Sequence, residues 1–184
     1  MMTIAPVRKP EQLPDVRRLF EAYLASLTFD LDFQGFADEQ ATLPGKYAPP
    51  SGELLLAHRE GRTVGCVALR DLGAGLRDLG AGVRDLGAGV CDLGAGVCDL
   101  GAGVCEMKRL FLDPAARGHG VGKALVAAII EAARERGYAI MRLDTAAASM
   151  GPAVALYKSF GFREIAAYTP NPLPDALFLE LALG

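Results

Sequence analysis

Residues 117–124, with the sequence RGHGVGKA, contain glycine at positions 118, 120 and 122. Glycine lets the backbone turn tightly, and a strongly helical pattern begins directly after this loop. Free N–H groups at the start of a helix, together with the helix dipole, favour an anion. The segment therefore predicts a phosphate-binding loop, to which Arg117 and Lys123 would add positive charge. A glycine-rich loop that serves only close packing is the alternative.

Two other phosphate-binding patterns do not fit this loop. A Walker A loop requires glycine where Arg117 stands and serine or threonine where Ala124 stands, so its magnesium ligand is absent from the sequence. The dinucleotide-binding fingerprint requires glycine in place of Lys123. The sequence excludes both patterns at this position.

The cysteines and histidines are not spaced for a metal site. Zinc ligands commonly stand two to four residues apart, whereas three of the four cysteines recur every seven residues and the fourth stands alone. Neither histidine is placed to complete a site, and we expect no metal ion. The residues considered are Cys66, Cys91, Cys98, Cys105, His58 and His119.

Hydrophobic periodicity predicts the elements that must position the loop. A strand at 105–112 precedes it, and a helix at 121–137 with a glycine stop follows it. Antiparallel hairpins and one strand–helix–strand unit indicate an α+β domain with a mixed, mainly antiparallel sheet flanked by helices. The other expected elements are a strand at 2–5, helices at 10–27 and 36–43, a hairpin over 53–70, a strand at 140–145, a helix at 152–160 and a strand at 176–183.

Residues 70–104 consist of five near-identical heptads, RDLGAGL, RDLGAGV, RDLGAGV, CDLGAGV and CDLGAGV. The apolar positions are spaced as in a coiled coil, but two glycines per unit cost a helix about 2 kcal/mol relative to alanine. A strand is disfavoured because an odd repeat exchanges its apolar face at every copy. We interpret the repeat as a surface excursion inserted between two strands of one domain, 1–184. A glycine-rich helical or extended stack and an oligomerisation arm are the alternatives.

The composition is that of a globular domain with its own core. Hydrophobic residues make up 51% and charged residues 22% of the 184 residues, and the formal net charge is −3. This balance excludes wholesale disorder and argues against a general nucleic-acid binder. The charge-free stretches are shorter than the ~20 apolar residues of a membrane span, and the first residues contain no signal-peptide core. We expect a cytoplasmic monomer or homodimer that binds neither nucleic acid nor membrane.

Two segments resemble the signatures of a known family. Arg117, Gly120 and Gly122 match the R/Q-x-x-G-x-G/A signature of the GNAT superfamily of N-acetyltransferases, and ALYKSFGF (155–162) resembles its later Y-x-x-x-G-F signature, in the same order and separation. The resemblance is dense over 105–168, where CEMKRLFLDP and GYAIMRLDT are similar to small bacterial members, and only the repeat falls outside it. It implies the GNAT fold and an N-acetyltransferase that uses acetyl-CoA.

The resemblance also implies where acetyl-CoA binds. Its pantetheine would lie along Leu110, Phe111 and Leu112, where this strand diverges from IMRLDT (140–145). Position 119 is variable in the signature, and its histidine is expected to face solvent. The pyrophosphate would lie on the amides of Gly118, His119, Gly120, Val121, Gly122 and Lys123, beside Arg117.

Glu106 is the candidate general base, because transfer to an amine requires that a proton be taken before or during attack. It stands where similar histone acetyltransferases carry a glutamate base. Strand alternation places Glu106, Lys108, Leu110 and Leu112 on one face, near the thioester. A surface carboxylate paired with Lys108 or Arg109 is the alternative. The base could act directly or through water.

Tyr157 is the candidate general acid, because a phenol can give a proton or a hydrogen bond to the departing CoA thiolate. In the family, the tyrosine of this motif commonly stands beside the sulfur. A core aromatic residue of the helix is the alternative. Many relatives have asparagine seven residues earlier, where this chain has Met150.

Three residues are candidates for the acceptor side. Asp144 could orient the acceptor amine, pair with Arg142 or cap a turn. Tyr168 and Asn171 precede the final strand, where the family often closes the acceptor side, although a rigid proline-rich loop would also explain them. The leading interpretation is direct acetyl transfer from acetyl-CoA to a primary amine of a small molecule or peptide. A non-catalytic acyl-CoA-binding or regulatory module and a self-association role of the repeat are the alternatives.

Overall fold

The computed structural model describes residues 1–29, 31, 34–73 and 103–184, so most of the repeat lies outside the described residues. Within these described ranges, seven strands form one sheet in the order β1-β2-β3-β4-β5-β7-β6. Neighbouring strands are antiparallel except β4 and β5, which are parallel. The mixed, mainly antiparallel sheet predicted from the sequence is therefore confirmed. The strands are β1 (Met2–Pro6), β2 (Glu53–Arg59), β3 (Arg62–Asp71), β4 (Val104–Leu112), β5 (Ile140–Ala146), β6 (Arg163–Ile165) and β7 (Ala176–Ala182).

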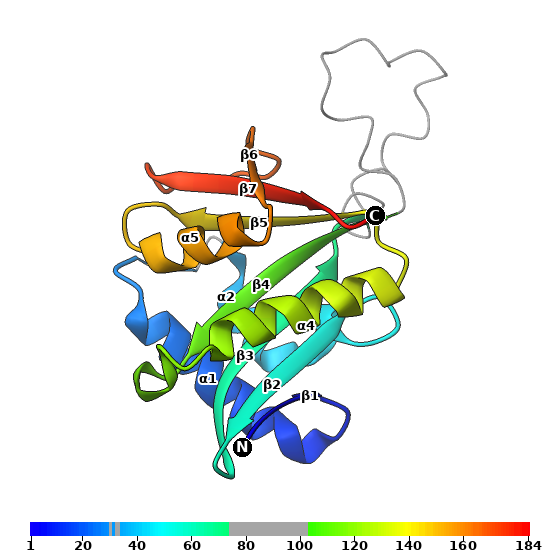
Figure 1. Ribbon diagram of the computed structural model, residues 1–184, viewed down its shortest axis with the longest axis vertical. Helices are drawn as coiled ribbons and strands as arrows, with labels where there is room; N and C mark the ends of the chain where they lie inside the picture. The colour runs from blue at the N-terminus through cyan, green and yellow to red at the C-terminus, as the bar shows by residue number, and fades with distance from the viewer. Residues whose placement is uncertain (30, 32–33, 74–102) are drawn as a thin grey trace.

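Helices cover both faces of the sheet in the described part of the chain (Figure 1). On one face lie α4 (Val121–Glu135) and α5 (Gly151–Ser159), and on the other lie α1 (Leu13–Ser26) and α2 (Phe36–Thr42). Each face has its own apolar core, because the strand residues alternate between the two sides. The core under α4 includes Leu125 and Ile129, and the core under α1 includes Leu19 and Phe20, all four of them fully buried.

The strands β4 and β5 stay together only at their first residues. Their pairing joins Val104–Glu106 to Ile140–Arg142 and does not continue beyond these residues. Figure 1 shows the two strands diverging from this end, with α5 and the start of α4 at the wide end. The sheet therefore opens at the position that the family resemblance implies for the pantetheine.

A β-bulge interrupts β4 within this opening. The β3 partners change from Ala68, opposite Lys108, to Cys66, opposite Phe111. Two residues of β4, Arg109 and Leu110, therefore occupy the space of one residue of β3. Arg109 has a φ of +57°, a left-handed conformation that is uncommon for a residue with a β-carbon.

The bulge reverses the alternation along the second half of β4. Lys108 reaches Asp144 on the side of α1 and α2, whereas Leu110 and Leu112 pack against the core under α4. Phe111 belongs to the core under α1. The prediction that Glu106, Lys108, Leu110 and Leu112 share one face is therefore wrong, because the extra residue shifts the pattern by one position.

The ends of the heptad repeat belong to the sheet. Asp71 at the end of β3 pairs with Cys105 of β4, and the Leu72 amide donates to the Val104 carbonyl oxygen at 3.0 Å. The repeat thus connects two neighbouring antiparallel strands. Residues 74–102, on which the excursion, stack and arm interpretations depend, lie outside the described residues.

The remaining findings concern membranes, metals and cysteines. Over the described ranges, no helix combines the length and apolar character needed to cross a bilayer. The same residues contain no group of three or more histidine, cysteine or acidic side chains that could hold a metal ion. Cys66 and Cys105 are buried free thiols, and Cys91 and Cys98 lie outside the described residues.

Candidate functional site

The glycines of the loop before α4 have two different roles. Gly118 and Gly120 each have a φ of +77°, and a β-carbon built on either would meet nothing within 4 Å. These two residues are therefore required by the backbone turn and not by packing. A β-carbon on Gly122 would lie 3.1 Å from Leu112 Cδ1 and 3.6 Å from Leu156 Cδ2. This third glycine allows α4 to approach β4 and α5 closely.

The loop presents backbone amides and positive charge to solvent. The first backbone hydrogen bond of α4 is donated by the Ala124 amide to the Gly120 carbonyl oxygen at 3.0 Å. The N–H groups of the residues before Ala124 therefore have no acceptor within the helix. Arg117, His119 and Lys123 are exposed. The His119 ring Nδ1 lies 2.8 Å from the Arg117 carbonyl oxygen. An anion can therefore approach this helix N-terminus from solvent.

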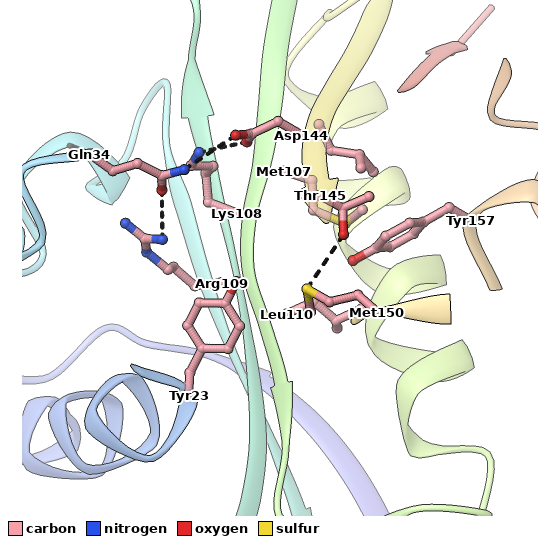
Figure 2. Close-up of a pocket in the computed structure, with 11 residues that line it drawn as sticks. Tyr23, Gln34, Met107, Lys108, Arg109, Leu110, Asp144, Thr145, Met150 and Tyr157 are labelled. Atoms are coloured by element: carbon pink, nitrogen blue, oxygen red, sulfur yellow. Dashed lines mark hydrogen bonds and ion pairs between the residues drawn. The ribbon is translucent and has the colours of Figure 1, made fainter. Parts of the chain in front are cut away.

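A pocket lies where β4 and β5 diverge (Figure 2). Its lining is polar on the side of α1 and α2 and largely apolar on the side of α5. The polar side consists of Tyr23, Gln34, Lys108, Arg109 and Asp144, and the other side of Met107, Leu110, Leu143, Thr145, Met150 and Tyr157. The pocket therefore connects the two faces of the sheet.

Tyr157 from α5 points its hydroxyl into the pocket (Figure 2). Its side chain is 6% exposed, and its ring packs against Phe162 with centroids 5.9 Å apart. Burial raises the pKa of the Tyr157 phenol, so it stays protonated at neutral pH and can donate a hydrogen bond. Close by, the Thr145 hydroxyl donates to the Met150 sulfur at 3.5 Å.

Glu106 does not line the pocket. Its side chain is fully buried, and its carboxylate accepts a hydrogen bond from Arg70 Nε at 2.5 Å and another from the Tyr168 hydroxyl at 2.7 Å. Lys108 Nζ lies 3.8 Å from the same carboxylate. Of the partners considered from the sequence, Lys108 is close and Arg109 is not a partner. The main partner, Arg70, was missed because it stands inside the first heptad.

Asp144 is the acidic side chain that does line the pocket. Its Oδ1 accepts from Lys108 Nζ at 2.8 Å, and its Oδ2 accepts from Asn171 Nδ2 at 2.9 Å and Gln34 Nε2 at 3.2 Å. Burial alone would raise the pKa of Asp144, but the charge and hydrogen bond of Lys108 and the hydrogen bond of Asn171 lower it. The group is therefore ionised at neutral pH. Arg142, the alternative partner, binds Glu180 at 2.7 Å instead.

Arg109, at the bulge, connects β4 to α2 through hydrogen bonds to Glu39. Its guanidinium donates to the Glu39 carboxylate at 2.7 and 3.2 Å and to Gln34 Oε1 at 2.9 Å. It also lies 5.2 Å from the ring centroid of Phe36. Burial would lower the pKa of Arg109, but the hydrogen bonds and charge of Glu39 raise it, so the buried pair stays charged. No periodicity in the sequence indicated this role or that of Gln34.

The other predicted residues take separate positions. Leu110 lines the pocket, whereas Phe111 packs against Tyr23 on the opposite face of the sheet with centroids 6.2 Å apart. Leu112 is the neighbour of Gly122. Tyr168 donates to Glu106, and the Arg142 guanidinium lies 5.4 Å from its ring centroid, so the segment before β7 does close over this side of the sheet.

Comparisons with known proteins agree with this geometry. The pattern of the acetyltransferase (GNAT) family matches residues 16–162. An uncharacterized N-acetyltransferase of Schizosaccharomyces pombe is 36% identical over 184 residues, which cover 100% of this chain and 96% of that protein. Another uncharacterized N-acetyltransferase, from Dictyostelium discoideum, is 42% identical over 216 aligned residues, with 99% and 100% covered. The structure of a Salmonella typhimurium protein, solved with its cofactor acetyl-CoA, has a TM-score of 0.63 at 19% identity and covers 100% of this chain and 94% of its own.

Proposed function

The chain belongs to the acetyltransferase (GNAT) family and is an acyltransferase, and we propose that it transfers an acetyl group from acetyl-CoA to the nitrogen of a primary amine. The observation that carries the proposal is the pocket between the diverging strands β4 and β5. It joins a protonated tyrosine, Tyr157, on one side of the sheet to an ionised carboxylate, Asp144, on the other.

The residues before α4 fit the phosphates of acetyl-CoA. The turn at Gly118 and Gly120 has space where a β-carbon would stand, and the amides at the helix start favour an anion. Exposed Arg117 and Lys123 add positive charge on either side. The fold relative from Salmonella typhimurium, which holds acetyl-CoA, supports this choice of donor.

The proposed reaction is a direct attack. A C–N bond forms between the amine nitrogen and the carbonyl carbon of the thioester, and the C–S bond breaks, so that CoA leaves as a thiolate. Tyr157 gives its phenolic proton or a hydrogen bond to this sulfur. The amine gives up one proton to a base, and the chain forms no covalent intermediate.

For the base we propose Glu106, acting through water. Its carboxylate is held by Arg70 and Tyr168 and does not line the pocket, so it does not meet an amine in the pocket directly. Lys108 Nζ lies 2.8 Å from Asp144 and 3.8 Å from Glu106, and it lines the pocket. The proton would reach Glu106 through water, because an ammonium group has no lone pair to accept it.

A panel of primary amines, offered with acetyl-CoA and followed by release of CoA, tests the proposal. The Tyr157→Phe variant should lose roughly 10²-fold or more of the turnover with the best acceptor, the usual contribution of a general acid. Tyr138→Phe is the matched control, because the Tyr138 hydroxyl donates to the Ser51 carbonyl away from the pocket and does not line it. Absence of both CoA release and acetyl-CoA binding would refute the function. Equal turnover of the two variants would remove Tyr157 from the mechanism.

A further inference from the structure

The pocket holds one acidic side chain among its described lining residues, and this is Asp144. An alkyl amine has a pKa of about 10.4, so an acceptor arrives at neutral pH mostly as an ammonium ion. Desolvating that cation is costly unless a carboxylate pairs with it. Among the described lining residues, Asp144 is therefore the anionic partner that a charged acceptor meets in this pocket.

Three side-chain donors hold Asp144, namely Lys108, Gln34 and Asn171. A carboxylate offers about four lone-pair sites, and the backbone of Asp144 itself also interacts with its carboxylate. Figure 2 shows the Gln34 amide placed between Arg109 and Asp144. An incoming ammonium group therefore needs the place of one of the present donors.

The cation already on Asp144 has a second carboxylate within reach. Lys108 Nζ is 2.8 Å from Asp144 Oδ1 and 3.8 Å from Glu106 Oε1, and its side chain is 8% exposed. A small movement of this flexible side chain would shorten its distance to Glu106 and release Asp144 Oδ1. The charge of Lys108 would then stay paired with Glu106, and the ammonium group of the acceptor would take the place of Lys108 at Asp144.

The two other buried carboxylates near this group, among the residues that the structure describes, are already paired with arginine. Glu39 is bound by Arg109 and Lys46, at 2.7 and 2.6 Å. Glu106 is held by Arg70 at 2.5 Å through its Oε2, whereas Lys108 lies 3.8 Å from its Oε1. Glu39 and Glu106 are each paired with an arginine. Asp144 is paired with Lys108, which also lies near Glu106.

We propose that Asp144 binds the acceptor as its ammonium ion and that Lys108 moves from Asp144 toward Glu106 when the acceptor enters. This inference rests on the proposed function, because it assigns the acceptor subsite of the same pocket. It names the acceptor class as cationic primary amines. The bound ammonium group first loses one proton to solvent water, and the neutral nitrogen then attacks the thioester and gives its second proton to the base. Asn171 and Gln34, from the two segments beside the pocket, hold the Asp144 carboxylate in place.

The experiment is a calorimetric titration of n-butylammonium chloride into the protein saturated with CoA, which has no acetyl group to transfer. Wild type should bind the probe, and Asp144→Asn should bind it roughly ten- to a hundredfold more weakly, the range for a hydrogen bond to a charged group. Glu180→Gln is the matched control, because Glu180 is an arginine-paired carboxylate on the neighbouring strand that does not line the pocket. It should bind the probe as wild type does. Pentan-1-ol, a neutral probe of similar size, should bind no more weakly to Asp144→Asn than to wild type.

A second variant tests the exchange and does not depend on how well Asp144→Asn folds. Lys108→Gln removes the competing cation, so the probe should bind severalfold more tightly than to wild type. If Lys108 merely anchors the sheet, or if it binds an anionic acceptor, the same variant shows no gain. Any one of three results overturns the inference: no gain in binding by Lys108→Gln, undiminished binding by a folded Asp144→Asn, or no binding of the probe by wild type.

The outcome is separable from that of the proposed function. Acetyl-CoA binding by wild type is measured in the same instrument. If acetyl-CoA does not bind, the proposed function fails, and the titration of butylammonium into the free protein still decides whether Asp144 holds an ammonium ion.

Discussion

Replacement of Gly120 with aspartate tests the phosphate loop by placing a negative charge at the start of α4. Gly120 is the residue before the first turn, with a φ of +77° and open space where a β-carbon would stand. The substitution therefore causes no collision. Its backbone cost is roughly 1 kcal/mol, since aspartate tolerates the left-handed region better than most residues.

The expected loss of acetyl-CoA affinity is larger than the loss of stability. Two unit charges 4 Å apart repel by about 1 kcal/mol in bulk water and about 4 kcal/mol at the effective dielectric of a protein surface. The loop is exposed, so we expect about 2 to 3 kcal/mol, or roughly 30- to 150-fold weaker binding. Salt should reduce this difference, because it screens charges outside the protein interior.

The assay compares acetyl-CoA binding by wild type, Gly120→Asp and Gly120→Asn in a calorimeter, with thermal unfolding of each. Asparagine has the size and backbone tolerance of aspartate without its charge, so the difference between the two variants isolates electrostatics. Gly120→Asn should bind within a few-fold of wild type. Equal affinities of the two variants would refute the assignment of phosphate to this helix start, whatever their stabilities.

Three further predictions concern other parts of the molecule. Glu106→Gln should leave acetyl-CoA binding intact and lower turnover at neutral pH by about 10²- to 10⁴-fold, with less loss at high pH where the amine is already neutral; unchanged turnover at neutral pH would leave Glu106 as a structural partner of Arg70. Glu39→Gln strips the buried Arg109 of its partner and should lower the free energy of unfolding in urea by about 3 to 5 kcal/mol, whereas Glu131→Gln in an exposed pair should cost less than about 1 kcal/mol. Arg109 and Lys46 lower the pKa of Glu39 against the effect of burial. The contribution of ionised Glu39 to the free energy of unfolding is therefore present at neutral pH and should be lost as pH falls below the usual glutamate value of about 4.3. Equal acid sensitivity of wild type and Glu39→Gln would contradict this. Deletion of 74–101 joins Gly73 to Ala102 and leaves a short connection between the paired residues Leu72 and Val104, so the protein should fold and bind acetyl-CoA as before; an unfolded product by circular dichroism would refute the interpretation of the repeat as an enlarged connection.

The local elements could be predicted because each follows from a short-range pattern. The spacing of Val16, Leu19 and Phe20 marks the buried stripe of α1, and all three are fully buried. The β2–β3 hairpin turns at Glu60 and Gly61, whose φ values of +53° and +78° suit a two-residue turn. Of the strands in the part of the chain that the structure describes, only β6, with three residues, was missing from the predicted strands, because so short a segment has no measurable alternation.

The site was less predictable, because its partners come from distant segments. The loop and Tyr157 carry their own motifs, but the bulge at Arg109 has no sequence signal, and it reversed the faces assigned to Leu110 and Leu112. The partner of Glu106 is Arg70, 36 residues away along the chain and within the repeat. The hydrogen bonds of Asp144 reach residues up to 110 positions away along the chain, so only the folded sheet brings these residues together.

The divergence of β4 and β5 divides the sheet into two plates, one of β1 to β4 and one of β5, β7 and β6. Their backbone contacts among the described residues lie at one end: three residue pairs of β4 and β5, and the amides of Ala139 and Ile140, which donate to the Gly103 carbonyl oxygen. A change in the angle between the plates about this end would therefore leave the other strand pairings intact. A ligand bound at the open end would hold the plates at a fixed angle, and amide exchange at Val104–Glu106 should slow when acetyl-CoA binds.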